Sequence, residues 1–337
     1  MSKRILITGG AGFVGSNYIH YILQKYENWH VVNLDKLTYA GNLETLKDIS
    51  EDPRYQFIKG DIADSDLVDK LMQTGFDLVI NFAAETHVDR SILDPAPFMK
   101  TNIIGTYTLL EGVRRYGIKR FIHLSTPEVY GGASPTSGKF KENSPLLPNN
   151  PYSASKAAAD HICRAFHRTY DVNVSYTRFA NAFGPYQYPE KLMPLAITFA
   201  LKSKPIPVYG DGQDRRNWIF VDDICRAIDL IIEEGKPGEA YNIPSEYEMT
   251  NLDLVTKVLD ILDKPHDLIK FVPQRPAHDW QYPLDSTKIK KDLKWEMVHK
   301  FDDAVKSTID WYVKNERWWQ KLPVLDYSSY YKQLAGQ

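Results

Sequence analysis

Tyr152 and Lys156 lie four residues apart, and they are the first side chains whose types and spacing could do chemistry together. They open an amphipathic stretch over residues 153–170, in which helical periodicity would place both on one face, about one turn apart. A lysine ammonium near a phenol favours the phenolate, so Tyr152 could take a proton from a substrate hydroxyl near neutral pH. The same spacing also occurs by chance on surface helices, so only the surrounding motifs can show whether this pair is catalytic.

A glycine-rich turn near the start of the chain indicates a dinucleotide. It lies between a strand expected over residues 4–8 and a helix expected over 16–25. Glycines there permit a tight turn, close approach of the backbone to a pyrophosphate and tight packing of helix on strand. The helix would point its free N–H groups at the phosphates. We therefore expect cofactor contacts from Gly9, Gly12, Phe13, Val14 and Gly15.

Carboxylates follow the expected strands at the edge where such sheets bind ligands. Asp35 ends the second strand, 20 residues after the last glycine of the turn, where it could accept hydrogen bonds from both adenosine ribose hydroxyls. It would repel a 2′-phosphate, so we expect NAD rather than NADP. Asp61-Ile62 follows the third strand and could meet the adenine amino group. Small residues after the fourth strand would let the cofactor lie against the backbone, in the run Phe82-Ala83-Ala84-Glu85.

With NAD at this edge, the tyrosine–lysine pair acquires a specific role. Ser125-Thr126 ends the fifth strand, and a hydroxyl there could hydrogen-bond the same substrate oxygen as Tyr152. Lys156 could also hold the nicotinamide ribose. These residues together predict hydride transfer between a carbinol and nicotinamide.

Short apolar runs that alternate with amphipathic segments must position these residues. Six strands are expected over 4–8, 30–34, 55–59, 78–82, 120–124 and 174–178, and helices over 16–25, 67–73, 101–115 and 153–170. This spacing implies right-handed crossovers and an α/β fold, a Rossmann-type doubly wound parallel sheet.

The amino-acid composition changes after about residue 180, where prolines and aromatic residues become frequent. Helices are expected over 193–201, 224–234, 251–262 and 302–320, the last with Trp311, Trp318 and Trp319 as packing anchors. We predict an NAD-binding domain over 1–180 and an extension over 323–337. Between them, over 181–322, we predict a smaller, loop-rich nucleotide-sugar-binding region, parts of which could return to the main sheet.

Composition narrows the class of protein. The chain has 337 residues and a net charge of −2, so its bulk charge indicates neither nucleic acid nor an anionic membrane. Its two cysteines, Cys163 and Cys225, lie far apart in apolar helical contexts, which favours reduced, buried thiols over a disulfide or a metal site. No secretory signal or apolar run of about 20 residues is found. We expect a cytoplasmic protein with no metal, nucleic-acid or membrane partner.

The segments that carry these motifs resemble the extended short-chain dehydrogenases/reductases that modify nucleotide sugars, most closely the dTDP-glucose 4,6-dehydratases. The resemblance covers nearly the whole chain. It rests on GGAGFVGSN at 9–17, LDKLTYAGN at 34–42, AAETHVDRSI at 83–92, TPEVYG at 126–131, PYSASKAAAD at 151–160 and GPYQYPEKLMP at 184–194. The segments at 85–91 and 149–156 are the most distinctive.

The resemblance implies a division of labour. Thr126 and Tyr152 would sit at the sugar C4 hydroxyl, and Tyr152 would remove its proton while hydride moves to NAD. The C4 ketone would acidify the C5 hydrogen, which Glu128 would remove as a base. Loss of the C6 hydroxyl as water and return of hydride to C6 would regenerate NAD.

The resemblance also implies which residues hold the ligands. Further NAD contacts are expected from Lys36, Leu37, Thr38 and Thr101. The planar guanidinium groups of Arg216 and Arg275 would pair with the diphosphate oxygens. Nucleotide-sugar contacts are expected from Thr86, His87, Thr126, Asn181, Glu190, Lys191, Leu192, Pro207, Tyr209, Arg216, Asn251, Arg275 and His278. Related enzymes imply a homodimer paired through the helices over 101–115 and 153–170.

One position departs from the family pattern beside the chemistry. The dTDP-glucose dehydratases carry Thr-Asp-Glu where this chain has Thr126-Pro127-Glu128, and their aspartate is regarded as the general acid that expels water. Proline has no proton to give, fixes φ and lacks an N–H. A second departure, Trp280-Gln281 in place of two arginines, could change how the nucleotide or sugar is held.

Several interpretations stay open. Glu128 could act as base and then as acid, as the Thr-Ser-Glu arrangement of GDP-mannose dehydratases suggests. The elimination could instead stop at an alkene or act on another sugar such as a UDP-hexosamine. The enzyme could also epimerise C4 or decarboxylate a uronic acid, in the manner of UDP-glucuronate decarboxylases. Glu128 favours C5 chemistry, because simple C4 epimerases need no base there. A catalytically silent NAD-binding protein is the alternative outside enzymes.

Overall fold

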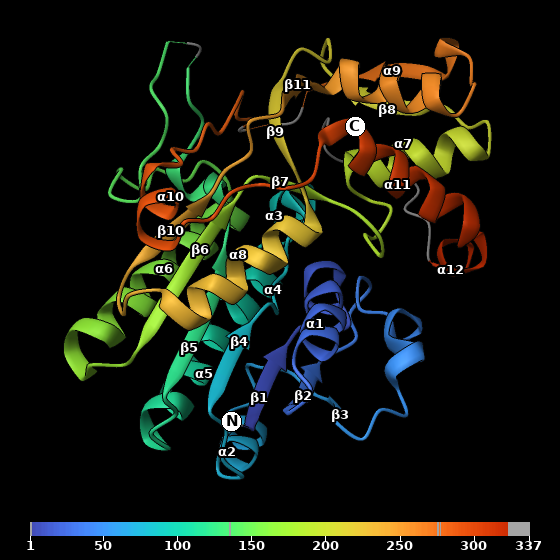
Figure 1. The fold of residues 1–337 in the computed structure, drawn as a ribbon. Helices are drawn as coiled ribbons and strands as arrows, with labels where there is room; N and C mark the ends of the chain where they lie inside the picture. Colours follow the sequence, from blue (N-terminus) through green and yellow to red (C-terminus); the bar gives the residue numbers. More distant parts are fainter. Residues whose placement is uncertain (1, 135, 275, 277, 323–337) are drawn as a thin grey trace.

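The computed structural model of the chain describes residues 2–134, 136–274, 276 and 278–322. Its centre is a seven-stranded parallel sheet with the strand order β10-β6-β5-β4-β1-β2-β3 (Figure 1). The chain builds outward from β1 in one direction and then, from β4, in the other. The strands are β1 Lys3–Thr8, β2 Trp29–Asp35, β3 Tyr55–Lys59, β4 Leu78–Asn81, β5 Arg120–Ser125, β6 Val174–Phe179 and β10 Ala240–Ile243.

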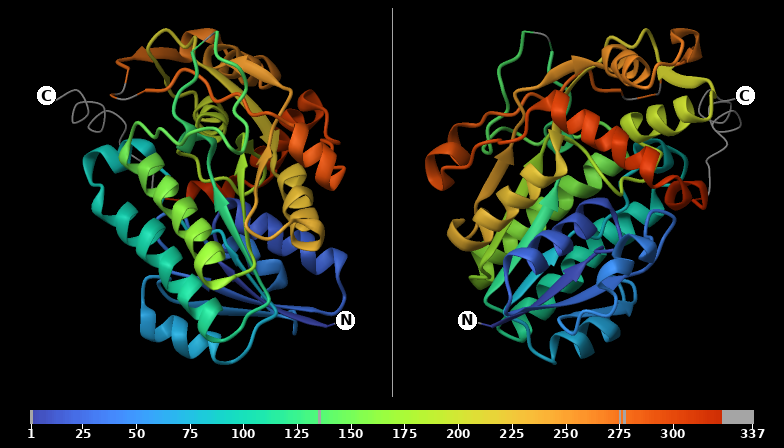
Figure 2. Two further views of the ribbon diagram at one scale, coloured as in Figure 1. Left: turned by 90° about the vertical axis from the view of Figure 1, so that its left-hand side faces the viewer. Right: turned by 45° about the vertical axis from the view of Figure 1, so that its right-hand side comes forward.

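Helices cover both faces of this sheet (Figures 1 and 2), which is why its central strands are almost continuously apolar. One face packs against α1 (Phe13–Lys25) and α8 (Val221–Glu234), whose buried side chains share one apolar cluster. The other face packs against α2 (Ser65–Met72), α5 (Thr106–Arg115) and α6 (Pro151–Tyr170). The predicted α/β doubly wound sheet is confirmed, with β10 as a seventh strand from beyond residue 180.

The carboxyl edge of the sheet carries the short elements that sequence periodicity does not reveal. After β4 come α3 (Val88–Leu93), α4 (Ala96–Phe98) and a π-helical turn, Met99–Gly105, which runs into α5. The single helix expected over 101–115 is therefore wrong in its first turn. After β5 comes a 3₁₀ turn, Pro127–Tyr130, and β2 is followed by another, Leu43–Ile49.

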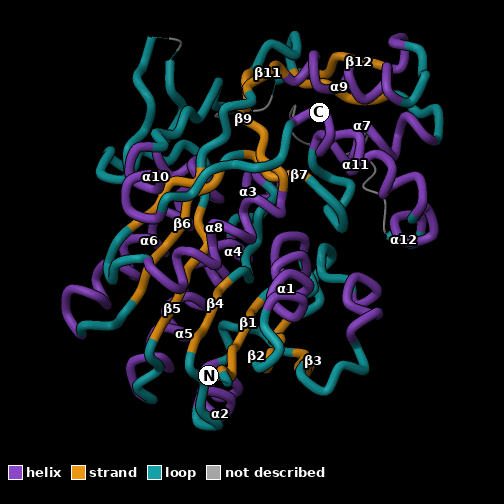
Figure 3. The backbone as a smooth tube through the Cα atoms, in the orientation of Figure 1, coloured by secondary structure: helices purple, strands orange, loops and turns teal. Residues whose placement is uncertain are grey.

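The second half of the chain forms a smaller region over that edge, towards the top of Figures 1 and 3. Three short strands make a sheet in the order β11-β9-β7, and β12 pairs with β8. Their bounds are β7 Asn181–Phe183, β8 Ile206–Tyr209, β9 Arg215–Phe220, β11 Glu248–Thr250 and β12 Ile269–Val272. The helices of this region are α7 Leu192–Leu201, α9 Asn251–Ile261, α11 Phe301–Lys314 and α12 Glu316–Gln320, with a 3₁₀ turn at His266–Leu268. A further helix, α10 Thr287–Leu293, lies instead beside β10, and its Ile289 and Leu293 join the apolar cluster of α1 and α8.

This region has an apolar core of its own, built from α7, α9 and α11. Trp319 is buried in it, while Trp311 and Trp318 pack against it with their ring centroids 5.1 Å apart, so the predicted packing role of these tryptophans is confirmed. The single helix expected over 302–320 is wrong, because the chain leaves helical geometry at Asn315.

The two cysteines are free and buried on opposite faces of the main sheet, Cys163 against one apolar cluster and Cys225 against the other. Within the described part of the chain, no helix is both long enough and apolar enough to cross a membrane.

Candidate active site

The glycine turn after β1 is held in a shape that only small residues allow. Gly9 has φ +71°, and a Cβ there would lie 2.5 Å from the backbone nitrogen of Ala83 on the neighbouring β4 turn. A Cβ on Gly15 would collide with the carbonyl oxygen of Gly9. Gly12 caps α1 without any side-chain hydrogen bond, which leaves the helix N-terminus available to an anion. The turn thus fits a pyrophosphate close to the backbone.

Asp35 lies where the sequence places it, at the end of β2 beside the glycine turn. Its two carboxylate oxygens accept hydrogen bonds from the backbone nitrogens of Ala11 (2.9 Å) and Leu37 (2.8 Å). Burial raises the pKa of Asp35, and these two hydrogen bonds oppose that rise. Leu37 has φ +56°, a strained value for a leucine. The two backbone hydrogen bonds fix the carboxylate, whose remaining lone pairs can accept hydrogen bonds from ribose hydroxyls.

Charged side chains at the ends of β3 and β4 lie near one another. Lys36 pairs with Asp61 at 2.9 Å, and Lys100 lies 3.6 Å from the same carboxylate. Burial raises the pKa of Asp61, but the pairing with Lys36 brings it below its ordinary value. Burial also raises the pKa of Glu85, against the opposing charges of Lys36 and Arg90. The charge of Lys36 therefore acts on the carboxylates of both Asp61 and Glu85.

Two asparagines that the sequence gave no reason to single out hold this edge together. The side chain of Asn102, in the π-helical turn, accepts from the backbone nitrogen of Glu85 and donates to its carbonyl oxygen, both at 3.0 Å. It also donates to Ser155 on α6 at 2.8 Å. Asn33 on β2 accepts from the backbone nitrogen of Gly10 at 3.0 Å. Only the folded chain brings these partners together.

Tyr152 opens α6 in a firmly fixed position. Asn150 and Ser153 form a capping box around it, and the backbone nitrogen of Tyr152 donates to Ser91 on α3. Burial, and next the charge of Glu128, raise the pKa of Tyr152, whereas a hydrogen bond with the Thr126 side chain lowers it. Tyr152, Thr126 and Glu128 thus lie close enough to act on one another, while their predicted contacts with the sugar stay predictions.

Lys156 lies one turn further along α6, almost wholly buried. Its Nζ donates to the carbonyl oxygen of Leu124 at 2.5 Å and lies 3.4 Å from Nε2 of His123. Burial lowers the pKa of Lys156 to about 8. The sequence led us to expect that Lys156 would lower the pKa of Tyr152. In this structure the ammonium donates to β5, and burial, Glu128, Thr126 and Asp160 act on the pKa of Tyr152, so this expectation stays a prediction.

The 3₁₀ turn after β5 explains how proline fits beside the chemistry. Thr126 caps the turn by accepting from the backbone nitrogen of Glu128 at 3.3 Å. Pro127 occupies the first position of the turn, where an N–H would have no internal partner and a fixed φ is favourable. Pro127 is buried and Glu128 is half-buried. The backbone therefore presents Glu128 as it would with another residue at 127, but without a second acid.

Four of the predicted substrate residues meet around Glu190. Lys191 donates to the carbonyl oxygen of Thr86 at 2.9 Å. Oε2 of Glu190 lies 3.8 Å from Nε2 of His87, and Tyr39 donates to Oε1 at 3.1 Å. Burial raises the pKa of Glu190 to about 7. The segment Glu190-Lys191 of the second region thus contacts Thr86 and His87, which follow β4.

Other predicted nucleotide-sugar contacts, among them one diphosphate arginine, lie on the second region and the loops next to it. Arg216 on β9 donates to the carbonyl oxygens of Trp280 and Asp279 at 2.6 and 2.9 Å. His278 lies 2.9 Å from Asp214, and Tyr209 donates to Asp89 on α3 at 2.8 Å. Arg275 lies outside the described residues.

The other predicted residues are placed by their elements without a polar side-chain contact that would define a role. Phe82 packs against Tyr18 with ring centroids 5.4 Å apart, and Ile62 is buried under the π-helical turn. Asn181 starts β7, Leu192 starts α7, Pro207 is in β8 and Asn251 starts α9. The remaining ones are Phe13 and Val14 in the first turn of α1, Thr38 after β2, Ala83 and Ala84 after β4, and Thr101 in the π-helical turn.

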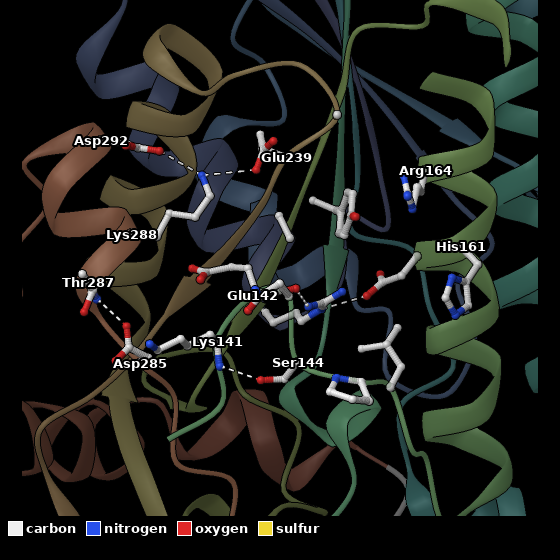
Figure 4. Close-up of a pocket in the computed structure, with 18 of the residues that line it drawn as sticks. Lys141, Glu142, Ser144, His161, Arg164, Glu239, Asp285, Thr287, Lys288 and Asp292 are labelled. Atoms are coloured by element: carbon white, nitrogen blue, oxygen red, sulfur yellow. Dashed lines mark hydrogen bonds and ion pairs between the residues drawn. The ribbon is translucent and has the colours of Figure 1, made fainter. Parts of the chain in front are cut away.

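A cavity of about 730 Å³ lies elsewhere, between the later part of α6, β10 and α10 (Figure 4). Lys288 at its wall pairs with Asp292 at 2.9 Å, and the buried pair of Arg178 and Asp160 closes at the same distance. None of the predicted site residues lines this cavity. It is therefore not the candidate active site.

Comparison with known proteins adds independent findings. A family model described as GDP-mannose 4,6 dehydratase matches residues 6–308. The dTDP-glucose 4,6-dehydratase of Xanthomonas campestris pv. campestris (strain B100) is 46% identical over 334 residues, covering 94% of each chain.

Solved structures are similar over almost the whole chain. The dTDP-glucose 4,6-dehydratase of Streptomyces venezuelae, solved with NAD bound, superposes with a TM-score of 0.92 at 44% identity, over 95% of this chain and 100% of that one. UDP-glucose 4-epimerase of Thermotoga maritima reaches 0.86 at 29% identity, over 93% of this chain and 99% of that one.

Proposed function

The chain belongs to the NAD-dependent nucleotide-sugar 4,6-dehydratases of the extended short-chain dehydrogenase/reductase family, and from this premise we propose which residues perform its reaction and on which substrate. It is a lyase-type enzyme that uses NAD and acts on a nucleotide sugar. We propose dTDP-glucose as that sugar, since relatives 46% identical to this chain are dTDP-glucose 4,6-dehydratases. We assign the catalytic roles from one observation: at the end of β5, the Thr126 hydroxyl and the Glu128 carboxylate both act on the phenol of Tyr152.

The residues around the glycine turn fit NAD. Gly9 and Gly12 leave room for the pyrophosphate at the start of α1, and Asp35 offers carboxylate oxygens to the adenosine ribose. Asp61 lies close enough to Lys36 to form the adenine end of the same site. When bound there, NAD would supply a reversible hydride acceptor and a positively charged nicotinamide ring at this edge.

Tyr152 serves as the base for the first step. It accepts the proton of the C4 hydroxyl as the C4–H bond is broken, and the Thr126 hydroxyl holds the same oxygen. The high pKa of the buried phenol means that a positive charge must be near when it gives up its own proton. Lys156, held against β5, provides part of that charge.

Glu128 serves both later steps. Its carboxylate removes the C5 hydrogen, which the C4 ketone has made acidic, and it then holds a proton one position from C6. Because Pro127 can give none, the same carboxyl group returns that proton to the departing C6 hydroxyl. One glutamate thus takes the place of the aspartate–glutamate pair of the dTDP-glucose dehydratases.

The test uses dTDP-glucose labelled with deuterium at C4, with the purified enzyme in ordinary water. We expect loss of one water by mass spectrometry, with the deuterium found at C6 of the product. UDP-glucose, UDP-N-acetylglucosamine and UDP-glucuronate are run in parallel. Unchanged mass with an inverted C4, or loss of carbon dioxide from the glucuronate, would refute the dehydratase assignment.

Glu128→Gln separates oxidation from elimination. The amide cannot take the C5 hydrogen, so we expect the dehydration rate to fall by about 10²- to 10⁴-fold while bound NAD is still reduced. The absorbance of the reduced cofactor after mixing with dTDP-glucose measures this. Tyr152→Phe is the control, since it should block reduction itself.

We also propose a homodimer in the cytoplasm. Ile104, Tyr107 and Tyr170 are apolar residues of the π-helical turn, α5 and α6 that are 49%, 46% and 52% exposed. The rings of Tyr107 and Tyr170 both pack against Phe166, so they form one patch. Such a patch suits pairing with its symmetry mate. Two free, buried thiols are compatible with a reducing compartment.

A further inference from the structure

A row of polar side chains crosses the interior of the main sheet. Thr8 on β1, Asn81 on β4 and His123 on β5 are direct partners in the strand register. None of the three is more than 1% exposed. Burial of polar groups is unfavourable unless each finds a hydrogen-bond partner, so three such residues side by side on neighbouring strands indicate a connected network.

The contacts of the row are continuous and end at Lys156. Thr8 donates to Oδ1 of Asn81 at 2.7 Å, and Nδ2 of Asn81 lies 3.2 Å from Nδ1 of His123. Nε2 of the same imidazole lies 3.4 Å from Nζ of Lys156. The same Nδ2 of Asn81 donates to Oγ1 of Thr106 on α5 at 3.3 Å. The imidazole thus lies between an amide and the ammonium that follows Tyr152 by one helical turn.

The number of protons makes these contacts interdependent. A neutral imidazole has one N–H and one lone pair, and an ammonium can only donate. While Lys156 is charged, Nε2 of His123 must accept and Nδ1 carries the proton. Asn81 must then turn its amide oxygen to the ring and to Thr106, and its amide nitrogen to Thr8, whose hydroxyl accepts instead of donating. With the amide nitrogen towards the ring, Nε2 carries the proton and Lys156 must be a neutral amine.

We propose that His123 is a positioning residue for the redox step, which holds the charged Lys156 through Nε2 and is itself held by Asn81. The inference rests on the proposed function, because it concerns the lysine of that same site. Complete burial and the charge of Lys156 keep the pKa of His123 well below its ordinary value, so its lone pair stays available.

Other groups also act on Lys156 and are part of the expectation. Asp160 and Cys163, on its own helix, both raise its pKa against the larger effect of burial. Asp160 is paired with Arg178 on β6 at 2.9 Å, which limits its influence. From β5, the contacts are Leu124 and His123. Among these, His123 alone can change its hydrogen-bonding role by shifting a proton between its nitrogens.

Two amide substitutions separate the two nitrogens. His123→Gln places an amide near Nε2 and still offers an oxygen to Lys156, whereas His123→Asn reaches only towards Nδ1. Without an acceptor, the ammonium is less favourable, so in His123→Asn the dehydration rate should fall at a pH about one unit lower than in the parent. In His123→Gln, the dehydration rate should fall at the same high pH as in the parent, so the two pH–rate profiles should share their alkaline limb. Superimposable limbs for parent and His123→Asn would overturn the inference.

Structural damage is controlled with Tyr176→Phe. Tyr176 is the register partner of His123 on β6 and is also buried. A change of the same size there should leave the alkaline limb where it is. If Tyr176→Phe shifted the limb as far as His123→Asn does, the effect would belong to the sheet as a whole and the inference would fail.

A second measurement needs no turnover. With ¹⁵N-histidine, the nine imidazoles are observed by NMR, and His123 is identified by its loss in His123→Gln. We expect the Nδ1–H form at pH 6.5 and a change to the Nε2–H form around pH 8, as Lys156 loses its proton. An Nε2–H form or an imidazolium at pH 6.5 would refute the inference. If no nucleotide sugar reacts but this switch is seen, only the proposed function fails.

Discussion

Pro127 fits the backbone of the 3₁₀ turn, but it leaves the reaction without a general acid at this position. At the first position of a 3₁₀ turn it costs no hydrogen bond, and Thr126 still caps the turn. Sequence comparison with the dehydratase pattern identified the missing acid, but it could not show that the turn, and with it Glu128, keeps its place.

Pro127→Asp tests whether a single glutamate limits the rate. A second acid next to C6 should raise the dehydration rate several-fold, and an aspartate in the first turn suits the helix N-terminus. The rate of cofactor reduction should not change. Pro127→Ala is the control for the lost proline, which should cost about 0.4–1 kcal/mol of stability. Equal dehydration rates for the aspartate and alanine variants would show that no acid is lacking.

Glu190 makes stability depend on pH in an unusual direction. Its pKa rises from an ordinary 4.5 to about 7 on folding, mainly through burial. The folded state is therefore favoured while the carboxyl is protonated. This contribution is complete below pH 4.5 and is lost as the pH rises through 7, by roughly 3 kcal/mol.

Glu190→Gln should remove that dependence. The amide stays neutral, so the variant should gain stability over the parent between pH 5 and pH 8 in urea denaturation without ligands. Glu234→Gln, at an exposed position on α8, is the control. A constant difference between Glu190→Gln and parent over this range would contradict the assigned titration.

The site was predictable where one segment carries the information. Tyr152 and Lys156 follow from a helical spacing, and Gly9 to Asp35 from a turn with a carboxylate at a fixed distance. Asn102 and His123 were not found, because each matters only through partners on other strands and helices. An asparagine or a histidine in an apolar run carries no local signal of that kind.

Among the elements, α6 most directly sets the catalytic geometry. Its capping box, Asn150 with Ser153, fixes the turn that carries Tyr152. Asn150 is itself buried, so its amide has no water to replace the bond it makes to the backbone nitrogen of Ser153 at 2.9 Å.

Asn150→Ala should therefore weaken both stability and rate. Loss of the cap should cost about 1 kcal/mol in urea denaturation, and misplacement of Tyr152 should slow cofactor reduction several-fold. Asn150→Ser retains a capping oxygen and should recover most of both. A slow enzyme with unchanged stability would indicate that Asn150 acts on the substrate rather than on the helix.

Elements of the first half were predictable because apolar strands and amphipathic helices alternate there. The strands β7 and β11 have only three residues each, too few for a periodic pattern. The four residues of β10, Ala-Tyr-Asn-Ile, contain an asparagine and follow a loop, so only pairing with β6 defines them. The π-helical turn before α5 has the composition of an ordinary helix.

At the scale of the whole molecule, the exposed patch on α5 and α6 predicts the assembly. Tyr107→Asp would place a charge in a surface that we expect to be buried between two copies. Light scattering at micromolar concentration should give a dimer mass for the parent and a monomer mass for the variant. Val313→Asp, at an equally exposed apolar residue on α11, should remain a dimer. A monomeric parent would contradict the homodimer.

The pairing of α1 with α8 also bears on how the protein is made. The ribosome completes α1 long before α8, yet Tyr18 and Ile22 share a core with Ile224 and Ile228. Until α8 and β10 emerge, this face of the nascent sheet is covered by α1 alone, and β6 is left as an edge strand. A chain stopped at residue 180 should therefore aggregate or recruit a chaperone, while one released after β10 should not. The nucleotide-binding half thus becomes stable late in synthesis, only after much of the substrate-binding half has been translated.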